Sequence, residues 1–426
     1  MPPKQFPPPP RRPDPMPTAL AGLRVLDFSR MLAGPFSTQE LADLGAEVIK
    51  VETPVLGDDS RHNMTRGAGG EGAFYLSTNR NKKSIAIDLG NDEGQRIARE
   101  IAEHCDIVVE NFSNGVMGRF GLGYEALAAR NPRLIYCSIS GFGRDDDAAV
   151  PRRGYDAMFQ AASGFMSMTG EAAGPAMRTT VPIIDLATAL SATTAILAAV
   201  IARERLGVGQ FLELALIDVA LSLTSMYGTA TLVSGTPIAR NGNRSPQTAP
   251  SDVYETADGP IFITCGNDRL FRRMMSEALQ RPDLAQDPEF ASNVLRVQHE
   301  PRLTQTLRQI LAGHTREYWL SRLADAGVPA APVNDLMEAF DSADVQRRRL
   351  VSSVPHPTAG TVPLIRSPFR MSRTPVAAPL APPLLGQHRD EVLTQLLGWS
   401  PGAIDGAARA GAFGPAAAPV EHPLEP

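Results

Sequence analysis

The strongest constraint on the fold is the alternation of short apolar runs with helical patterns between Leu23 and about Gly143. The runs of strand length are LRVLDF, AEVIKVE, KSIAIDL, DIVVENF and LIYCSIS. Apolar strands joined by helical segments are typical of a parallel sheet that is covered by helices on both faces. The sequence therefore predicts an α/β protein whose large domain is Rossmann-like.

The second half of the chain predicts a smaller α+β domain. DVYE and PIFITC, separated by the turn Thr256 to Gly259, form a hairpin-like pattern, and three helical patterns follow it. The segment before this pattern is rich in Gly, Pro, Asn and Arg, which is typical of a linker. The expected boundaries are a disordered Pro-rich arm 1–16, a large domain 17–234 completed by 345–400, linkers 235–251 and 334–344, a small domain 252–333, and a flexible tail 401–426.

Composition excludes several classes of partner. A net charge of -5 without a basic run argues against nucleic acid. Three widely spaced cysteines offer neither a metal-ligand spacing nor a disulfide framework, and the N-terminus lacks the apolar core of a signal peptide. The stretch Leu186 to Ala202 is rich in Ala and Thr and is shorter than the roughly 20 apolar residues of a membrane span. We expect a cytoplasmic protein with no membrane partner, and no metal.

Asp185 is the first candidate for a catalytic residue. It follows the apolar run Val181 to Ile184, which predicts a buried strand, and precedes the stretch Leu186 to Leu206, which predicts a buried helix. A carboxylate at such a junction lies at the positive end of the helix dipole, which favours its anion. Asp is also a preferred N-cap residue. Position alone therefore fits a structural cap as well as a nucleophile.

Common cofactor and hydrolase motifs are missing. The segment LDFSRMLAGP resembles a dinucleotide-binding turn, but it lacks G-x-G-x-x-G, and Pro35 occupies a position where glycine would admit a pyrophosphate. An NAD-linked oxidoreductase therefore remains only as an alternative. The sequence also contains no G-x-S-x-G, H-E-x-x-H or Walker motif.

Several motifs together identify a family. LAGLRVLDFSRMLAGPFSTQELADLGAEVIKVE, NRNKKSIAIDL, VVENFSNGVMGRFGLGYEAL, NPRLIYCSISGFG and PLLGQHRDEVL occur in that order between about Leu20 and Leu397. The ordered set resembles the class III coenzyme A transferases, also called the CaiB–BaiF family. The turns GYD (Gly154 to Asp156) and MTG (Met168 to Gly170) precede Asp185 in the order of that family.

The resemblance implies a function and an assembly. It makes Asp185 the covalent nucleophile of an enzyme that moves CoA from an acyl-CoA thioester to a small carboxylic acid. The intermediates would be an aspartyl anhydride and an aspartyl–CoA thioester. Each step exchanges one activated carboxyl for another of similar energy, so coenzyme A is needed, as a substrate, but no metal and no nicotinamide. Members of the family form interlocked homodimers, and the expected linkers are compatible with that.

The resemblance also assigns a CoA site. It comprises Met31, Leu32 and Ala33 after the first strand, Asn111, Phe112 and Ser113 after the fourth, and Arg119, Arg153 and Tyr155. The carboxyl ends of parallel strands are where such sheets bind ligands, and arginine suits phosphate oxygens. Each arginine could instead be a solvated surface charge, and Phe112 could simply pack in the core.

Two positions depart from known branches of the family. Formyl-CoA transferase-like members carry Gln at the position of Leu32 and have a glycine-rich loop, where this chain offers only Cys265 to Asp268. Racemase-like members carry a histidine base at the position of Tyr155. These departures argue against oxalate or formate as substrates and against α-proton abstraction. A 2-methylacyl-CoA racemase or isomerase and a non-catalytic CoA-binding protein remain as alternatives.

Overall fold

The computed structural model describes Pro7 and residues 17–65, 69–144 and 154–415. Apart from the residues outside those ranges, the chain divides into two compact units. The first unit consists of Met1–Ser163, Thr180–Ser225 and Gln346–Pro426, and the second of Gly164–Thr179 and Met226–Val345. The segment 226–234, which the sequence places in the large domain, lies in the second unit, as does Gly164–Thr179.

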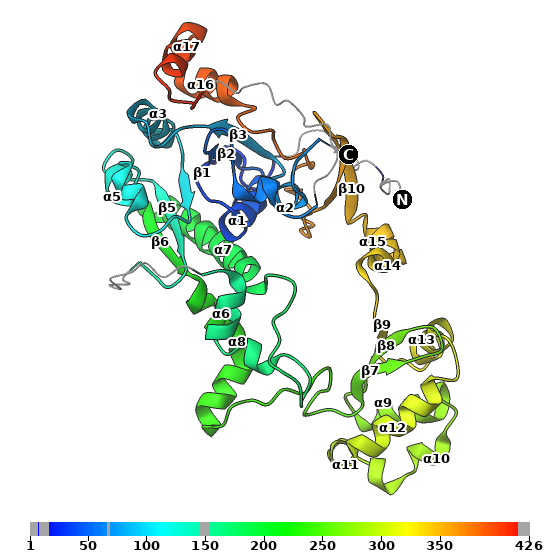
Figure 1. Cartoon of the computed structure of the whole chain (residues 1–426). Helices are drawn as coiled ribbons and strands as arrows, with labels where there is room; N and C mark the ends of the chain where they lie inside the picture. Colours follow the sequence, from blue (N-terminus) through cyan, green and yellow to red (C-terminus); the bar gives the residue numbers. More distant parts are fainter. Residues whose placement is uncertain (1–6, 8–16, 66–68, 145–153, 416–426) are drawn as a thin grey trace, which may run out of the picture. The chain divides into compact units, whose positions relative to one another are not determined.

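A six-stranded, fully parallel sheet forms the centre of the first unit (Figure 1). Its strand order is β3-β2-β1-β4-β5-β6, so the chain reverses direction across the sheet between β1 and β4. Ligands of open α/β sheets bind at the carboxyl ends of the strands beside such a reversal. The strands are β1 Arg24–Asp27, β2 Glu47–Glu52, β3 Lys82–Ala86, β4 Ile107–Glu110, β5 Ile135–Ser140 and β6 Gln210–Ala215.

Helices cover both faces of this sheet, because alternate residues of each strand point to opposite sides. One core cluster joins Val25 to Leu41 and Ile196, whereas the other joins Leu26 to Ile101. The predicted parallel α/β fold is therefore confirmed. The helices of this unit are α1 Ala33–Asp43, α2 Ala73–Thr78, α3 Asp92–Glu103, α4 Val116–Arg119, α5 Tyr124–Ala128, α6 Asp156–Ala162, α7 Ile183–Leu206, α16 Arg389–Leu397 and α17 Pro401–Arg409.

Two segments of the expected boundaries contain more structure than the sequence predicted. Part of the segment expected to be a flexible tail forms α17, whose Ile404 is buried with Phe413 in the core beside α3. The expected linker 334–344 contains α14 Leu336–Asp341, which begins with a capping box, and the start of α15 Ala343–Arg348. Residues 416–426 and most of the arm 1–16 lie outside the described ranges.

The second unit has a small antiparallel sheet of order β7-β8-β9. Its core contains Tyr254, Ile261, Leu307 and Trp319. Its strands are β7 Ser251–Glu255, β8 Pro260–Thr264 and β9 Ala330–Pro332, and its principal helices are α9 Asp268–Arg273, α10 Pro282–Ala285, α11 Asn293–Gln298, α12 Glu300–Leu311 and α13 Arg316–Asp325. A separate hairpin, β10 Val351–His356 with β11 Gly360–Ile365, belongs to the first unit.

In the part of the chain that the structure describes, two helices are long and apolar enough to cross a membrane by length and composition alone. The first, α7, buries Ile184, Ala192 and Ile196 in the core of the first unit, as a core helix of a soluble protein would. The second is α8 Leu216–Ser234, which is interrupted by non-helical backbone at Ser225. It leaves a row of apolar side chains exposed: Leu221, Leu223, Met226, Tyr227, Leu232 and Val233.

Candidate active site

Asp185 lies in the first turn of α7, which begins at Ile183. The prediction of a strand before it was wrong, and Asp185 does not hold the N-cap position that the sequence left open for it. The run Val181 to Ile184 joins none of the sheets, and the N-cap position is held by Pro182, whose side chain has no acceptor. The helix starts at Ile183, three residues earlier than the expected start at Leu186, and proline is well tolerated at a helix start.

The cap of α7 comes instead from Asp156, the first residue of α6. Its Oδ2 accepts hydrogen bonds from the backbone amides of Ile184 at 2.7 Å and of Asp185 at 3.1 Å. Its other oxygen accepts a hydrogen bond from Gln160 at 2.5 Å. Asp156 thus satisfies amides that would otherwise lack a partner at the helix start. Among the residues that the structure describes, none donates a hydrogen bond to the Asp185 carboxylate.

This environment raises the pKa of Asp185 to about 7. Burial is the main cause, and the nearby carboxylate of Asp156 adds to it. A carboxyl group that titrates near neutrality and is free of hydrogen bonds is typical of catalytic sites. Its anion would be a stronger nucleophile than that of an ordinary, fully hydrogen-bonded aspartate.

Asp27 shows what a structural carboxylate looks like in the same unit. Burial alone would raise the pKa of Asp27, but Lys82 and Lys50 outweigh it and lower that pKa to about 2. Ser29 and Thr38 also donate hydrogen bonds to it, at 2.5 Å and 2.6 Å. Within the described ranges, Asp185 has neither a lysine partner nor a hydroxyl donor of the kind that keeps Asp27 ionised, which supports a chemical role for Asp185.

The β1–α1 segment carries the first part of the expected CoA site. Met31 has a positive φ of 68°, and its amide donates to Asp58 at 3.1 Å. Leu32 is the N-cap residue of α1 and offers no capping acceptor, so amides of the first turn lack a side-chain partner. Gly34 is required here, because a Cβ would lie 2.2 Å from the Cβ of Ser29. Ala33 shares a core cluster with Ile184, the neighbour of Asp185.

A buried ionic network lies beneath this segment. Lys50 pairs with Asp58 at 2.9 Å and donates to the carbonyl of Ser29 at 2.7 Å. Lys82 pairs with Asp27 at 3.0 Å and donates to the carbonyl of Pro35 at 2.7 Å. Both lysines are almost completely buried, as are both carboxylates. The network therefore connects the end of β1, the interior of β2 and the start of β3 with Ser29 and Pro35, and so fixes the β1–α1 segment.

The β4–α4 segment is attached to the β1–α1 segment by Asn111. The Asn111 side chain accepts a hydrogen bond from the amide of Arg30 at 2.9 Å and donates one to its carbonyl at 2.8 Å. The Arg30 guanidinium lies over the ring of Phe112, 5.3 Å from its centroid. Phe112 is partly buried and also packs against the core, which agrees with the packing interpretation of that residue. Ser113 is exposed beside it.

Of the remaining expected residues, two are exposed and the third lies outside the described ranges. Arg119, the last residue of α4, is exposed, and no described residue pairs with its guanidinium. Tyr155 is the N-cap residue of α6, immediately before Asp156, and its side chain is 74% exposed. Arg153 lies outside the described residues. The structure thus places Ala33 in one core cluster with Ile184, the neighbour of Asp185, and connects the two strand-end segments through Asn111 and Arg30.

Sequence reasoning missed Asp156 and Arg30 as site residues. Asp156 was visible only as part of GYD, and its role depends on a helix start that lies 29 positions away. Arg30 adjoins the expected segment, but only the fold shows that it lies over Phe112. Glu110 was missed as well. Its carboxylate accepts a hydrogen bond from the amide of Phe112 at 2.8 Å and forms an ion pair with Arg144 at 2.6 Å.

The comparison with known families decides the identity. Residues 20–389 match CoA-transferase family III. The chain belongs to this family. It is therefore a CoA-transferase, an enzyme that moves CoA between an acyl-CoA thioester and a carboxylate, as the sequence motifs predicted.

Curated relatives and a solved structure resemble this CoA-transferase over most of its length. A succinyl-CoA:glutarate CoA-transferase of Mus musculus is 38% identical over 91% of this chain and 88% of its own. A succinate–glutarate CoA-transferase of Agrobacterium fabrum is 39% identical over 88% of this chain and 95% of its own. A crystal structure of a CaiB/BaiF family protein from Brucella suis is 36% identical, with a TM-score of 0.82, and covers 89% of this chain and 100% of that one.

Proposed function

We propose that this CoA-transferase moves CoA from succinyl-CoA to a second small dicarboxylic acid such as glutarate, and that Asp185 carries the acyl group and then CoA. The observation that carries the proposal is the Asp185 carboxylate itself, which is partly buried at a helix start and accepts no hydrogen bond from a described residue. The names of the relatives supply the substrate class.

The proposed chemistry exchanges acyl groups in four steps. The Asp185 carboxylate attacks the thioester carbonyl, the C–S bond breaks, and CoA thiolate leaves a mixed anhydride. The thiolate attacks the aspartyl carbonyl, which releases the donor acid and leaves an aspartyl–CoA thioester. The acceptor carboxylate then attacks that thioester, its C–S bond breaks, and CoA thiolate leaves a second mixed anhydride between Asp185 and the acceptor. The thiolate finally attacks the acceptor carbonyl of that anhydride. Acyl-CoA is released and Asp185 returns to its carboxylate.

The surrounding groups would support these steps through position and charge. Uncapped amides in the first turn of α1 and the dipole of α7 favour the negative charge that develops on oxygen. The Arg119 guanidinium has no partner among the described residues and could therefore bind a CoA phosphate. The Arg30 guanidinium, which lies over the Phe112 ring, adds a second positive charge at the same edge of the sheet. Each role follows from the strand-end position that open α/β sheets use for ligands.

An acceptor screen tests the proposed substrate class. Succinyl-CoA is offered with glutarate, oxalate, formate and a straight-chain monocarboxylate, and new CoA thioesters are measured by mass spectrometry. We expect turnover with glutarate and little with oxalate or formate, because Leu32 cannot donate a hydrogen bond as glutamine would. Faster transfer to a monocarboxylate than to glutarate would contradict the dicarboxylate proposal while leaving the family assignment intact.

The role of Arg119 can be measured separately. We expect Arg119→Ala to raise the KM for the CoA thioester about tenfold or more with little change in kcat, because a charged hydrogen bond to phosphate would be lost. Arg205→Ala is the matched control, since Arg205 is exposed in the last turn of α7 and has no described partner. Equal KM values for both variants and the wild type would exclude Arg119 from the CoA site.

The raised pKa of Asp185 predicts a pH dependence. The attacking form is the anion, so kcat/KM should rise with pH and level off above an apparent pKa of about 7. Asp156→Asn keeps an oxygen that can cap α7 but removes the neighbouring charge, so the profile should move to lower pH. The move should be partial, because burial, the larger cause, remains. An unchanged profile in Asp156→Asn would show that another group limits the rate.

We also propose that the enzyme is a homodimer. The exposed apolar side chains along α8 support this, because monomeric proteins rarely leave so many large apolar groups in water. Sedimentation at several protein concentrations, compared with the chain mass of 45.6 kDa, would test it.

A further inference from the structure

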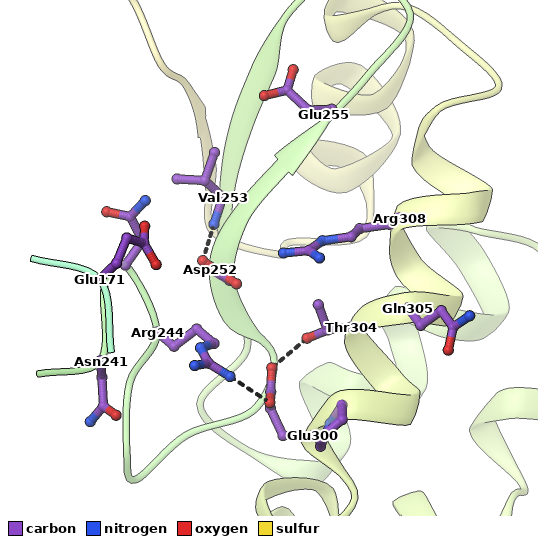
Figure 2. Close-up of a pocket in the computed structure, with 12 residues that line it drawn as sticks. Glu171, Asn241, Arg244, Asp252, Val253, Glu255, Glu300, Thr304, Gln305 and Arg308 are labelled. Carbon is purple, nitrogen blue, oxygen red and sulfur yellow. Dashed lines mark hydrogen bonds and ion pairs between the residues drawn. The ribbon is translucent and has the colours of Figure 1, made fainter. Parts of the chain in front are cut away.

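The second unit contains a cavity of about 800 Å³ that is separate from the Asp185 site. Figure 2 shows it between strand β7, helix α12 and the segment that precedes β7. Its lining is strongly polar. It includes four carboxylates, those of Glu171, Asp252, Glu255 and Glu300, and two guanidinium groups, those of Arg244 and Arg308.

One ionic group of the lining is already satisfied within the protein. Arg244 pairs with Glu300 at 3.0 Å, and the Thr304 hydroxyl donates to the other Glu300 oxygen at 2.6 Å. Both oxygens of Glu300 therefore have partners, and the pair contributes no net charge. This side of the cavity is a rigid polar wall rather than an open binding group.

Asp252 and Arg308 are not satisfied in this way. Asp252 is only 7% exposed, yet one of its oxygens accepts a hydrogen bond from the adjacent Val253 amide at 2.8 Å and the other from no described residue. Arg308 forms no ion pair within the described part of the chain, although Figure 2 shows its guanidinium extending from α12 toward Asp252. The second Asp252 oxygen is not enclosed by protein, since Asp252 lines the cavity, so a ligand in the cavity could supply its missing donor.

The charges of the lining define the ligand. Four carboxylates against two guanidinium groups leave an excess of two negative charges, so a simple anion would be repelled. A ligand with two cationic groups could meet Asp252 and the exposed Glu255 or Glu171. Arg308 is the one guanidinium of the lining that forms no ion pair with a described residue, although its charge already acts on the Asp252 carboxylate, and it could bind a carboxylate on the same molecule.

We propose that this cavity binds a small basic amino acid, that is, a molecule with one carboxylate and two ammonium or guanidinium groups. Asp252 receives one cationic group, Arg308 holds the carboxylate, and Glu255 or Glu171 receives the second cationic group. The side-chain amides of Asn241 and Asn243, which also line the cavity, are able to donate to the carboxylate or accept from the cations.

Calorimetric titration of the full-length enzyme tests the proposal with four matched probes. L-lysine carries all three groups, whereas cadaverine lacks the carboxylate, 6-aminohexanoate lacks the α-ammonium, and norleucine lacks the terminal ammonium. We expect lysine to bind about tenfold or more tightly than each of the others, because each loses one charged hydrogen bond. No measurable binding of lysine, or equal binding of lysine and cadaverine, would overturn the proposal.

Two variants with matched controls assign the groups. Asp252→Asn should weaken lysine and cadaverine alike, whereas Arg308→Gln should weaken lysine about tenfold and leave cadaverine unchanged. Asp325→Asn and Arg269→Gln, both exposed residues of the second unit without a described partner, should change nothing. Thermal unfolding checks that each variant is folded. Unchanged lysine binding in folded Asp252→Asn would refute the assigned site.

Discussion

Asp185→Asn is expected to reduce turnover by several orders of magnitude while the protein still binds its CoA substrate. An amide cannot form the acyl anhydride, so the covalent route is closed. The substitution should not disturb the start of α7, because Asp156 rather than Asp185 caps that helix. Wild-type enzyme that is mixed with succinyl-CoA and trapped with hydroxylamine should carry a modification on the Asp185 peptide, and the variant should carry none.

The same variant should gain stability, which separates loss of chemistry from loss of fold. The pKa of Asp185 is about 7 in the folded protein, against roughly 3.9 for an unfolded aspartate. Between those values the unfolded state binds fewer protons, so ionisation of Asp185 reduces stability as the pH rises toward 7. Asparagine removes that cost, and the melting temperature of the variant should exceed that of the wild type at pH 8 but hardly at pH 4. Wild-type turnover by a stable Asp185→Asn protein would end the covalent proposal.

Lys82→Met should destabilise the first unit by roughly 3–5 kcal/mol, because it leaves Asp27 buried without its lysine partner. It also removes a donor to the Pro35 carbonyl at the start of α1. Denaturant unfolding measures the loss. The adjacent Lys83→Met is the matched control: Lys83 is about a quarter exposed and pairs with Glu47 and Glu391 near the surface, so that variant should lose no more than about 1 kcal/mol.

A double substitution tests the explanation. If the loss comes from the unpaired Asp27 charge, Asp27→Leu combined with Lys82→Met should recover part of the stability, because two apolar groups need no partners. A Lys82→Met protein as stable as the Lys83→Met protein would show that the buried pair contributes little.

These lysines illustrate how the sequence relates to the structure. Lys50 and Lys82 stand inside the motifs AEVIKVE and NRNKKSIAIDL, which predicted strands and carried the family resemblance without revealing a role for either residue. The strands could be predicted because apolar periodicity is a local property. The ionic network could not, because it joins residues such as Asp27 and Lys82 that are 55 positions apart.

The difference between local patterns and contacts over long sequence distances also explains where the predictions from the sequence were wrong. Strand β6, QFLELA, was missed because its alternation runs directly into the helical pattern of α8. Asp185 was singled out by its position and the family motifs, and its role as the nucleophile stays a prediction, whereas the capping role that its position left open is filled by Asp156. A helix cap can come from any acceptor that the fold brings close, and at α7 that acceptor belongs to another helix.

The cap that Asp156 provides also bears on how the enzyme survives its own catalytic cycle. If the nucleophile capped its own helix, every acylation would withdraw the cap and loosen the first turn by about 1 kcal/mol, at the moment when a reactive anhydride must be held still. With the two tasks divided between two carboxylates, Asp185 can be converted to the anhydride and the thioester and released repeatedly while the amides of Ile184 and Asp185 keep their acceptor. The backbone beneath the reacting bond is thus the same before, during and after each exchange.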